Sequence, residues 1–552
     1  MPSIMEFTPE DFEGPWQEAQ RMLPALADAE VERGINGLFS FTADGGSLIG
    51  PSKKVDGFWM CEAVWVTHAV GAGRAVAEWM VGGAPSIDLA AADVNRFETH
   101  VHSPAYLLAR SSQSFREVYD IVHPQRPMEE PRPLRTSPFY PRQRELGAYF
   151  LEASGWERPQ WYEANRALLE DHEIPPMRGW AGRYWSLVVG AEHRATRERV
   201  ALYDMTSLKK AEVTGPGALD FLQRLNTAQL DKPVGSVTYT LMLDEKGGVK
   251  SDVTVARLGR DRFQVGCNGP RDLDWMRSNL PADGSVQVRD ITPGTCCLGV
   301  WGPHARDLVQ SLTEEDLSHE AFGFFRAREF SIGEVPVLAL RVSYVGELGW
   351  EVYTTADYGL RLWDLLWEAG RPYGVLAGGR GAFSGLRLEK GFRAWGSDVT
   401  SEHDPYEAGL GFAVRLDKGD FVGREALLRR REEGLRRKLA CLTLDDPSVV
   451  VMGSEPVWSG DAAVGYVTSA AYGYTVGRSI AYAWLPPELA EAGTGLEIEY
   501  FGARHAATVA EEPLFDPEMR RMRDPRPAAP APVPEAPRET VPQETAPLAR
   551  TS

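Results

Sequence analysis

Cysteine is scarce in this sequence. The 552 residues contain five cysteines, and none of them forms a C-x-x-C pair. They are Cys61, Cys267, Cys296, Cys297 and Cys441. This pattern excludes a disulfide framework and a zinc site built on cysteine pairs. We therefore predict free thiols, no metal ion and a reducing, cytoplasmic environment.

Long apolar runs and strongly basic runs are also absent. No stretch reaches about eighteen uninterrupted apolar residues, the length that a membrane-spanning helix needs, and the first residues lack a signal-peptide pattern. Lys and Arg number 59 against 78 Asp and Glu, so the formal net charge is -19. We expect neither a membrane nor a nucleic acid among the partners, because both attract basic surfaces.

A complete dinucleotide-binding fingerprint is the third absence. The nearest match, Gly71-Ala72-Gly73, lies between a predicted strand and a predicted helix, but Val76 stands where the third glycine belongs. The helix start could still hold an anion, because its unpaired N–H groups carry partial positive charge. An ordinary glycine turn explains the same residues.

The chain has the composition of a globular protein and the length of several domains. It is 43% hydrophobic and 25% charged. Short glycine-rich strands near the end predict a β-barrel, and the Pro/Ala-rich tail predicts disorder. We therefore predict an α+β multidomain fold in five parts. They are residues 1–103, which include a hairpin over 36–51, a connector over 104–185, an α+β domain over 186–430, a β-barrel over 431–522 and a disordered tail over 523–552.

The stretch "DEKGGVKSDVTVARL" places a carboxylate in the middle of a predicted strand. By two-residue alternation, Val249, Val253 and Val255 share one face, and Lys250 and Asp252 lie on the other. Asp is disfavoured inside strands, so its presence needs a reason. A solvated sheet face is the simpler explanation. The alternative is a carboxylate in a ligand pocket that exchanges a proton with a ligand nitrogen.

The stretch "RVSYVGELGWEVY" reads as a second hairpin. If it closes on Glu347-Leu348, Tyr344 and Glu351 lie opposite each other on one face. A hydroxyl beside a carboxylate can recognise the donor-rich edge of a heterocycle. A cross-strand polar pair without a ligand is the equally simple alternative.

Several stretches together resemble a known family. "INGLFSFTADGGSLIGP" and "DGFWMCEAVWVTHAVGAGRAVAEW" resemble the C-terminal end of the flavin domain of dimethylglycine oxidase, dimethylglycine dehydrogenase and sarcosine dehydrogenase. "SPFYPRQRELGAYFLEASGWERP" resembles their connector. "SYVGELGWE" and "SGLRLEKGFRAWGSD" resemble their folate-binding half, which the glycine-cleavage T-protein shares. "DFVGREAL" and "GYVTSAAYGYTVGRSIAYA" continue the resemblance into the terminal barrel.

The resemblance implies roles for individual residues. It makes Asp252 the catalytic acid–base group near the folate N10 atom, and Tyr344 and Glu351 pocket residues, with Glu351 on the pterin. The T-protein has an arginine where this chain has Phe383, so Arg380 is expected to hold the folate tail instead. The weaker folate candidates are Lys250 and Arg387. Gly71 and Gly73 become part of a flavin site.

The resemblance also implies a function. We expect oxidative N-demethylation of a small N-methyl amine, with capture of the one-carbon unit as 5,10-methylene-tetrahydrofolate. Residues 1–103 would complete a flavin domain whose FAD-binding first part comes from a flavoprotein partner subunit. Two alternatives stay open. One is a non-catalytic regulatory subunit, since the same architecture occurs in a regulatory subunit of pyruvate dehydrogenase phosphatase. The other is a stand-alone folate-dependent demethylase or aminomethyltransferase.

Overall fold

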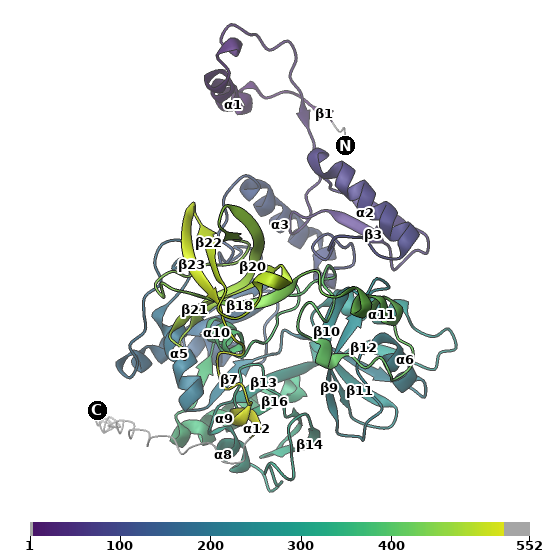
Figure 1. The fold of residues 1–552 in the computed structure, drawn as a ribbon, viewed down its shortest axis with the longest axis vertical. Helices are drawn as coiled ribbons and strands as arrows, with labels where there is room; N and C mark the ends of the chain where they lie inside the picture. Colours follow the sequence, from purple (N-terminus) through teal and green to yellow (C-terminus); the bar gives the residue numbers. More distant parts are fainter. Residues whose placement is uncertain (1–3, 524–552) are drawn as a thin grey trace, which may run out of the picture.

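The chain folds into a large body from which an N-terminal arm projects. The computed structural model describes residues 4–523 (Figure 1), so the predicted tail lies outside the described residues from residue 524 onward. We call residues 4–122 the arm and residues 123–523 the body. The helix α1 (Pro9–Met22) lies at the far end of the arm, away from the body.

The arm contains short strands and two further long helices. Its elements are β1 (Ile4–Met5), β2 (Asn36–Gly37), β3 (Leu48–Pro51), β4 (Trp59–Glu62), α2 (Ala69–Gly82) and α3 (Pro104–Glu117). β1 pairs with β2, and β3 pairs with β4. The hairpin predicted over 36–51 is therefore wrong, because its two strands pair with different partners. The predicted helix end is confirmed: Gly83 follows α2 in the left-handed conformation that glycine adopts at little cost.

The body begins with a connecting hairpin and then forms two sheets. The hairpin joins β5 (Ala148–Ala153) to β6 (Trp156–Tyr162) after α4 (Tyr140–Glu145). An antiparallel five-stranded sheet has the order β12-β8-β11-β10-β9. Its strands are β8 (Lys209–Thr214), β9 (Val237–Leu243), β10 (Val249–Arg257), β11 (Arg262–Cys267) and β12 (Gln287–Asp290). One face of this sheet packs against α6 (Ala218–Leu225) and α7 (Pro270–Ser278) around Val253, Val255, Leu222 and Met276.

A mixed six-stranded sheet forms the centre of the body, in the order β14-β15-β16-β13-β7-β17. Its strands are β7 (Ala201–Asp204), β13 (Thr295–Trp301), β14 (Ala327–Ile332), β15 (Val335–Leu340), β16 (Gly349–Thr355) and β17 (Leu376–Gly378). Only the β7–β17 pair is parallel among the described pairs of this sheet. The helices in this region are α5 (Leu187–Glu198), α8 (Ala305–Gln310), α9 (Ala356–Gly370) and α10 (Arg380–Glu389).

The last part of the body is a closed six-stranded barrel, as the glycine-rich strand pattern predicts. Its order is β18-β21-β20-β19-β22-β23. The strands are β18 (Lys438–Leu444), β19 (Pro456–Ser459), β20 (Ala462–Gly473), β21 (Arg478–Leu485), β22 (Gly495–Tyr500) and β23 (Ala503–Val509). The helix α11 (Arg424–Glu433) precedes the barrel, and α12 (Arg520–Arg523) follows it. Among residues 4–523, no helix is both long enough and apolar enough to cross a membrane.

Candidate functional site

The predicted carboxylate lies in the middle of β10. Asp252 pairs with Leu241 of β9, and the side chains of the strand alternate between buried and partly exposed positions. Val253 and Val255 belong to the core under the sheet, as predicted. Val249 does not, because a bulge between Val249 and Ser251 moves it into a different apolar cluster. The prediction that all three valines share one face is therefore wrong for Val249.

Two neighbouring side chains hold the Asp252 carboxylate. The Tyr239 hydroxyl donates to Oδ2 at 3.0 Å, and the Asn268 amide donates to Oδ1 at 2.8 Å. Burial raises the pKa of the Asp252 carboxyl, and the hydrogen bonds from Asn268 and Tyr239 oppose that rise by stabilising the charged form. A carboxylate with a fixed orientation and a raised pKa suits proton transfer.

Neither Tyr239 nor Asn268 was predicted, because only the pairing register of the strands identifies them. Antiparallel pairing places Tyr239 opposite Thr254, diagonally beside Asp252 on the same face. Thr254 pairs with Gly266 of β11, so the same register continued by two residues sets Asn268 opposite Asp252. The pairing register identifies these partners, and the register depends on the turns at both ends of β10.

Tyr344 lies in an aromatic stack. Its ring stacks on Phe383 with centroids 5.4 Å apart and on Phe392 with centroids 5.7 Å apart. Its hydroxyl donates to the backbone carbonyl of Arg393. Burial raises the pKa of the Tyr344 hydroxyl, and the charges of Arg387 and Asp252 also act on it. Tyr344 and Asp252 therefore lie in one electrostatic neighbourhood.

Glu351 does not face Tyr344 across a hairpin. In β16 it pairs with Gly299 of β13 and with Leu340 of β15, whereas Tyr344 lies outside the strands. The Tyr353 hydroxyl donates to Glu351 Oε2 at 2.5 Å. Burial raises the pKa of the Glu351 carboxyl, and the Tyr353 hydrogen bond and the Lys210 charge lower it.

The proposed hairpin tip is instead a buried ion pair. Glu347 is 1% exposed, and Arg197 donates to its Oε1 at 3.0 Å. Arg521 of α12 donates to the same carboxylate at 2.7 and 2.9 Å. The predicted hairpin is therefore wrong, because this segment folds inward to bind two arginines. The position of Glu347 between two glycines does not indicate, in the sequence, that its carboxylate is buried.

The two arginines of α10 differ in their surroundings. Arg387 donates to Asp398 at 2.6 Å and to the Ser469 hydroxyl of the barrel at 2.7 Å. Its side chain thus joins α10 to the barrel. The Arg380 guanidinium lies 5.4 Å from the centre of the Phe383 ring, and its charge acts on Tyr344. Asp252, Tyr344, Arg380 and Arg387 therefore lie in one electrostatic neighbourhood.

The other candidates lie elsewhere. The Lys250 ammonium lies 4.3 Å from the centre of the Trp275 ring on α7. Gly71 and Gly73 are both inside α2, which begins at Ala69 after the turn Val66–His68. The predicted glycine turn before the helix is therefore wrong. A Cβ atom at either glycine meets no heavy atom within 4 Å, so neither glycine is required by close packing.

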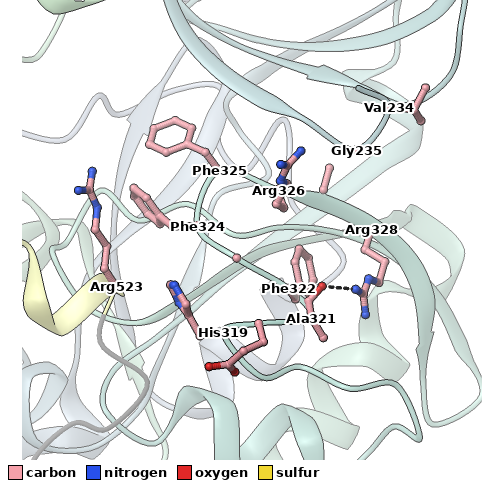
Figure 2. Close-up of a pocket in the computed structure, with 13 residues that line it drawn as sticks. Val234, Gly235, His319, Ala321, Phe322, Phe324, Phe325, Arg326, Arg328 and Arg523 are labelled. Atoms are coloured by element: carbon pink, nitrogen blue, oxygen red, sulfur yellow. Dashed lines mark hydrogen bonds between the residues drawn. The ribbon is translucent and has the colours of Figure 1, made fainter. Parts of the chain in front are cut away.

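A surface hollow of about 670 Å³ lies apart from these residues. It is lined by the segment from His319 to Arg328 and by Val234, Gly235 and Arg523. Figure 2 shows Phe324, Phe325 and Arg326 around it, and Arg328 donating to the Ala321 carbonyl. None of the predicted site residues lines this hollow.

The two sheets and the closed barrel have the fold of the glycine cleavage system aminomethyltransferase T from Bartonella henselae, with a TM-score of 0.59 and 24% identity over 69% of this chain and 98% of that chain. The chain belongs to the glycine cleavage T-protein family. The GCVT N-terminal domain matches residues 139–418, and the glycine cleavage T-protein C-terminal barrel domain matches residues 437–516. The FAD dependent oxidoreductase central domain matches residues 82–137. These matches confirm the predicted fold class.

Curated relatives confirm the predicted resemblance. The 4-methylaminobutanoate oxidase (formaldehyde-forming) of Paenarthrobacter nicotinovorans is 35% identical over 92% of this chain and 61% of its own length. Dimethylglycine dehydrogenase of Mus musculus is 33% identical over 92% of this chain and 58% of its own length. The chain thus spans about three fifths of these relatives. An aminomethyltransferase of Symbiobacterium thermophilum is 34% identical, over 70% of this chain and 99% of its own length.

Proposed function

We propose that this chain transfers the one-carbon unit of an N-methyl amine to tetrahydrofolate, with Asp252 as the acid–base group. The observation that carries the proposal is the Asp252 carboxylate itself. It is fixed in mid-strand by Tyr239 and Asn268 and lies in the same neighbourhood as Tyr344 and Arg380. A carboxylate on a solvent-exposed sheet face would need neither the two hydrogen-bond donors nor the nearby aromatic residues.

The side chains present fit a reduced folate. Glu351 has Oε1 without a donor among the described residues, so this oxygen can accept a hydrogen bond from an N–H group of the pterin. Tyr344 offers a ring for contact with the ligand, and Arg380 offers a cation for the negatively charged tail. We assign Glu351 to the pterin, Tyr344 to the middle of the ligand and Arg380 to its tail.

The transfer of the one-carbon unit requires control of the proton on one atom, N10 of the folate. Bound tetrahydrofolate supplies the N5 and N10 amines that capture the one-carbon unit as 5,10-methylene-tetrahydrofolate. Asp252 holds or accepts the proton of N10 through its carboxylate oxygens. Tyr239 and Asn268 keep that carboxylate oriented. Its pKa is raised, which brings the pKa closer to neutral pH. Such a positioned group contributes about 10² to 10⁴ in rate.

The arm provides part of the oxidative half of the reaction. We propose that FAD, which oxidises the N-methyl amine when bound, is held between the arm and the dinucleotide-binding part of a flavin domain. The match of residues 82–137 to the FAD dependent oxidoreductase central domain supports this assignment. Gly71 and Gly73 lie in the first two turns of α2, where N–H groups favour negative charge. A second, flavin-binding polypeptide is the proposed partner.

Replacement of Asp252 tests the central claim. Asp252→Ala in the complex with the flavin partner should lower methylene-folate formation about 10²- to 10⁴-fold. Oxidation of the amine should stay at the wild-type rate, because Asp252 acts only after that step. An equal yield of methylene-folate from the variant would contradict the assignment. Asp220→Ala, at an exposed position on α6 of the same domain, is the matched control.

One alternative has a specific observation in its favour. The chain covers 99% of an aminomethyltransferase that is named without a flavin, so the body alone could transfer an aminomethyl carbon. Flavin recovered with the purified native complex supports demethylation, and its consistent absence supports transfer alone. Calorimetry with tetrahydrofolate separates both functions from a regulatory subunit, which would not bind it.

A further inference from the structure

Two arginines lie near each other in the body, and neither is hydrogen-bonded to an acidic side chain among the described residues, although the Asp204 charge acts on both. Arg158 lies in β6, and Arg380 is the first residue of α10. Among the described residues, neither side chain donates to an acceptor, and Nε of Arg158 is fully buried without a hydrogen bond. A guanidinium needs hydrogen-bond acceptors, and leaving such a group buried and unpaired is costly.

Two other buried arginines of the body, Arg197 and Arg387, have acidic partners. Arg197 is paired with Glu347 and Glu389, and Arg387 is paired with Asp398. Burial lowers the pKa of Arg158 to about 10. Burial and the Arg158 charge both lower the pKa of Arg380. The Asp204 charge opposes both shifts without cancelling them. A bound anion near the two guanidinium groups would stabilise their charged forms further.

Close backbone packing fixes this arrangement. A Cβ atom on Gly379 would lie 2.0 Å from the Gln160 carbonyl oxygen, so the start of α10 touches β6 directly. Glu192 strengthens the contact, because it accepts from the Tyr162 amide at 2.7 Å and from the Gly379 amide at 2.8 Å. Arg158 precedes Gln160 by two residues on β6, and the strand has a bulge at Gln160, because Tyr149 pairs with Trp161 whereas Phe150 pairs with Pro159. The backbones that carry the two arginines are therefore held together by the fold.

The pair adjoins the proposed folate site. The Phe383 ring lies 5.4 Å from the Arg380 guanidinium and 5.4 Å from the Tyr344 ring. An anion held by the two arginines would therefore lie next to a ligand in contact with Tyr344. Guanidinium groups bind carboxylates through paired, charge-assisted hydrogen bonds.

We propose that Arg158 and Arg380 together bind the carboxylates of the glutamyl tail of folate. This inference rests on the proposed function, and it adds a residue from the connecting hairpin to the site. Phe383 occupies the position where the T-protein resemblance expects an arginine. The positive charge that is absent there is supplied by Arg158, from a different element.

The test compares tetrahydrofolate with a ligand that keeps the reduced pterin and lacks the whole p-aminobenzoylglutamate part. The full chain is titrated by calorimetry with tetrahydrofolate and with 6-methyl-tetrahydropterin, which has no glutamyl group. Arg158→Gln and Arg380→Gln should each weaken tetrahydrofolate binding about 10- to 100-fold, the usual contribution of a hydrogen-bonded charge. Affinity for the pterin should not change. Arg361→Gln, at an exposed ion pair on α9, is the matched control and should bind both ligands as the wild type does.

The outcomes separate the inference from the proposed function. Wild-type chain that binds neither ligand overturns the proposed function and the tail assignment with it. Wild-type binding of both ligands, with unchanged tetrahydrofolate affinity in Arg158→Gln, overturns the inference alone. An equal loss for both ligands also overturns it, since the variant would then have distorted the pterin site. If the variants fold poorly, the wild-type chain is titrated at increasing chloride concentrations instead. Chloride must then weaken the binding of tetrahydrofolate more than the binding of the pterin.

Discussion

The arm and the body place their large apolar side chains in opposite environments. In the arm, α1 buries none of its residues and α2 buries only Ala72 and Ala75. In the body, α10 buries most of its length, including Phe383 and Leu386. Most of the exposed large apolar residues among residues 4–523 lie in the arm. A concentration of exposed apolar side chains in one region is typical of an interaction site.

The difference indicates where each region obtains its stability. The body has its own cores and even buries charges, such as Glu347 and Glu389, inside ion pairs. The arm holds Phe12 against Trp16 and Trp59 against Trp79, but it leaves Val66, Val70 and Val81 almost fully exposed. The body thus carries its stability internally, whereas the arm leaves large apolar side chains exposed. Four predictions test this difference.

The largest effect on stability should come from breaking a buried ion pair in the body. Glu347→Ala removes a carboxylate that accepts from Arg197 and Arg521. The free energy of unfolding should fall by about 3–5 kcal/mol, because Arg197 loses one of its two buried partners. Urea denaturation followed by circular dichroism measures the change.

The control is an ion pair on the surface of the same body. Glu368→Ala breaks the exposed pair with Arg371 and should leave the urea midpoint unchanged, because solvent screens such pairs. A body that tolerates both substitutions equally would not depend on its internal ion pairs.

The second prediction exchanges glycine for alanine in both regions. Gly379→Ala places a methyl group 2.0 Å from the Gln160 carbonyl oxygen and should destabilise the body by about 1–3 kcal/mol, the usual effect of overpacking. Gly73→Ala in α2 meets nothing within 4 Å. It should stabilise the arm by about 0.5–1 kcal/mol, because alanine is the better helix former.

Hydrogen exchange measured by mass spectrometry reports on each region separately. Faster exchange in β6 and α10 is expected for the first variant, and slower exchange in α2 for the second. The same sign of change in both regions would contradict the contrast in packing.

Several elements of the fold could be predicted from the sequence. The strand that carries Asp252 was predictable, because two-residue alternation sets its faces, and so was the barrel, because its strands are short and bounded by turns. The end of α2 was predictable from Gly82-Gly83. Local patterns determine such elements, since only neighbouring residues contribute.

Long-range features were not predictable in this way. The inward fold of Glu347 depends on Arg521, which is far away in the sequence. The approach of Gly379 to Gln160 depends on how a helix packs against a hairpin. Asn268 could be found only once the register of β10 and β11 was known. In each case tertiary packing determines the contact, and a single sequence contains no local trace of it.

The third prediction compares the pH dependence of stability between the wild type, which has the Asp252 carboxyl group, and a variant with a neutral amide in its place. The folded pKa of Asp252 is raised above its ordinary value near 4, so the folded state binds the proton more tightly than the unfolded state. The stability from this protonation is present below the ordinary pKa and is lost as pH rises through the folded pKa. Asp252→Asn, which has no such charge, should lack this loss.

Urea denaturation of both proteins from pH 4 to pH 8 measures the difference. The free energy of unfolding of Asp252→Asn relative to the wild type should grow as pH rises from about 4 and then become constant. A difference that shrinks over this range would show that the Tyr239 and Asn268 hydrogen bonds outweigh burial.

The smallest effect on stability should accompany the largest effect on assembly. Val66 and Val81 of the arm are 92% and 90% exposed. Val66→Glu and Val81→Glu should change the free energy of unfolding of the isolated chain by less than about 0.5 kcal/mol, as exposed substitutions usually do. In a complex the same charges would enter an apolar interface without a partner, which is strongly unfavourable. Val234→Glu, at an exposed apolar residue of the body, is the matched control.

Co-purification with a polypeptide that carries the dinucleotide-binding half of an amine-oxidase flavin domain provides the measurement. The wild type and Val234→Glu should retain that polypeptide and its flavin absorbance at 450 nm, whereas the two arm variants should lose both. Because all four proteins are equally stable alone, any loss must arise at the interface. Retention of flavin by the arm variants would mean that the exposed surface of α2 is not where the flavin domain is completed, and the contrast between arm and body would then need a different partner.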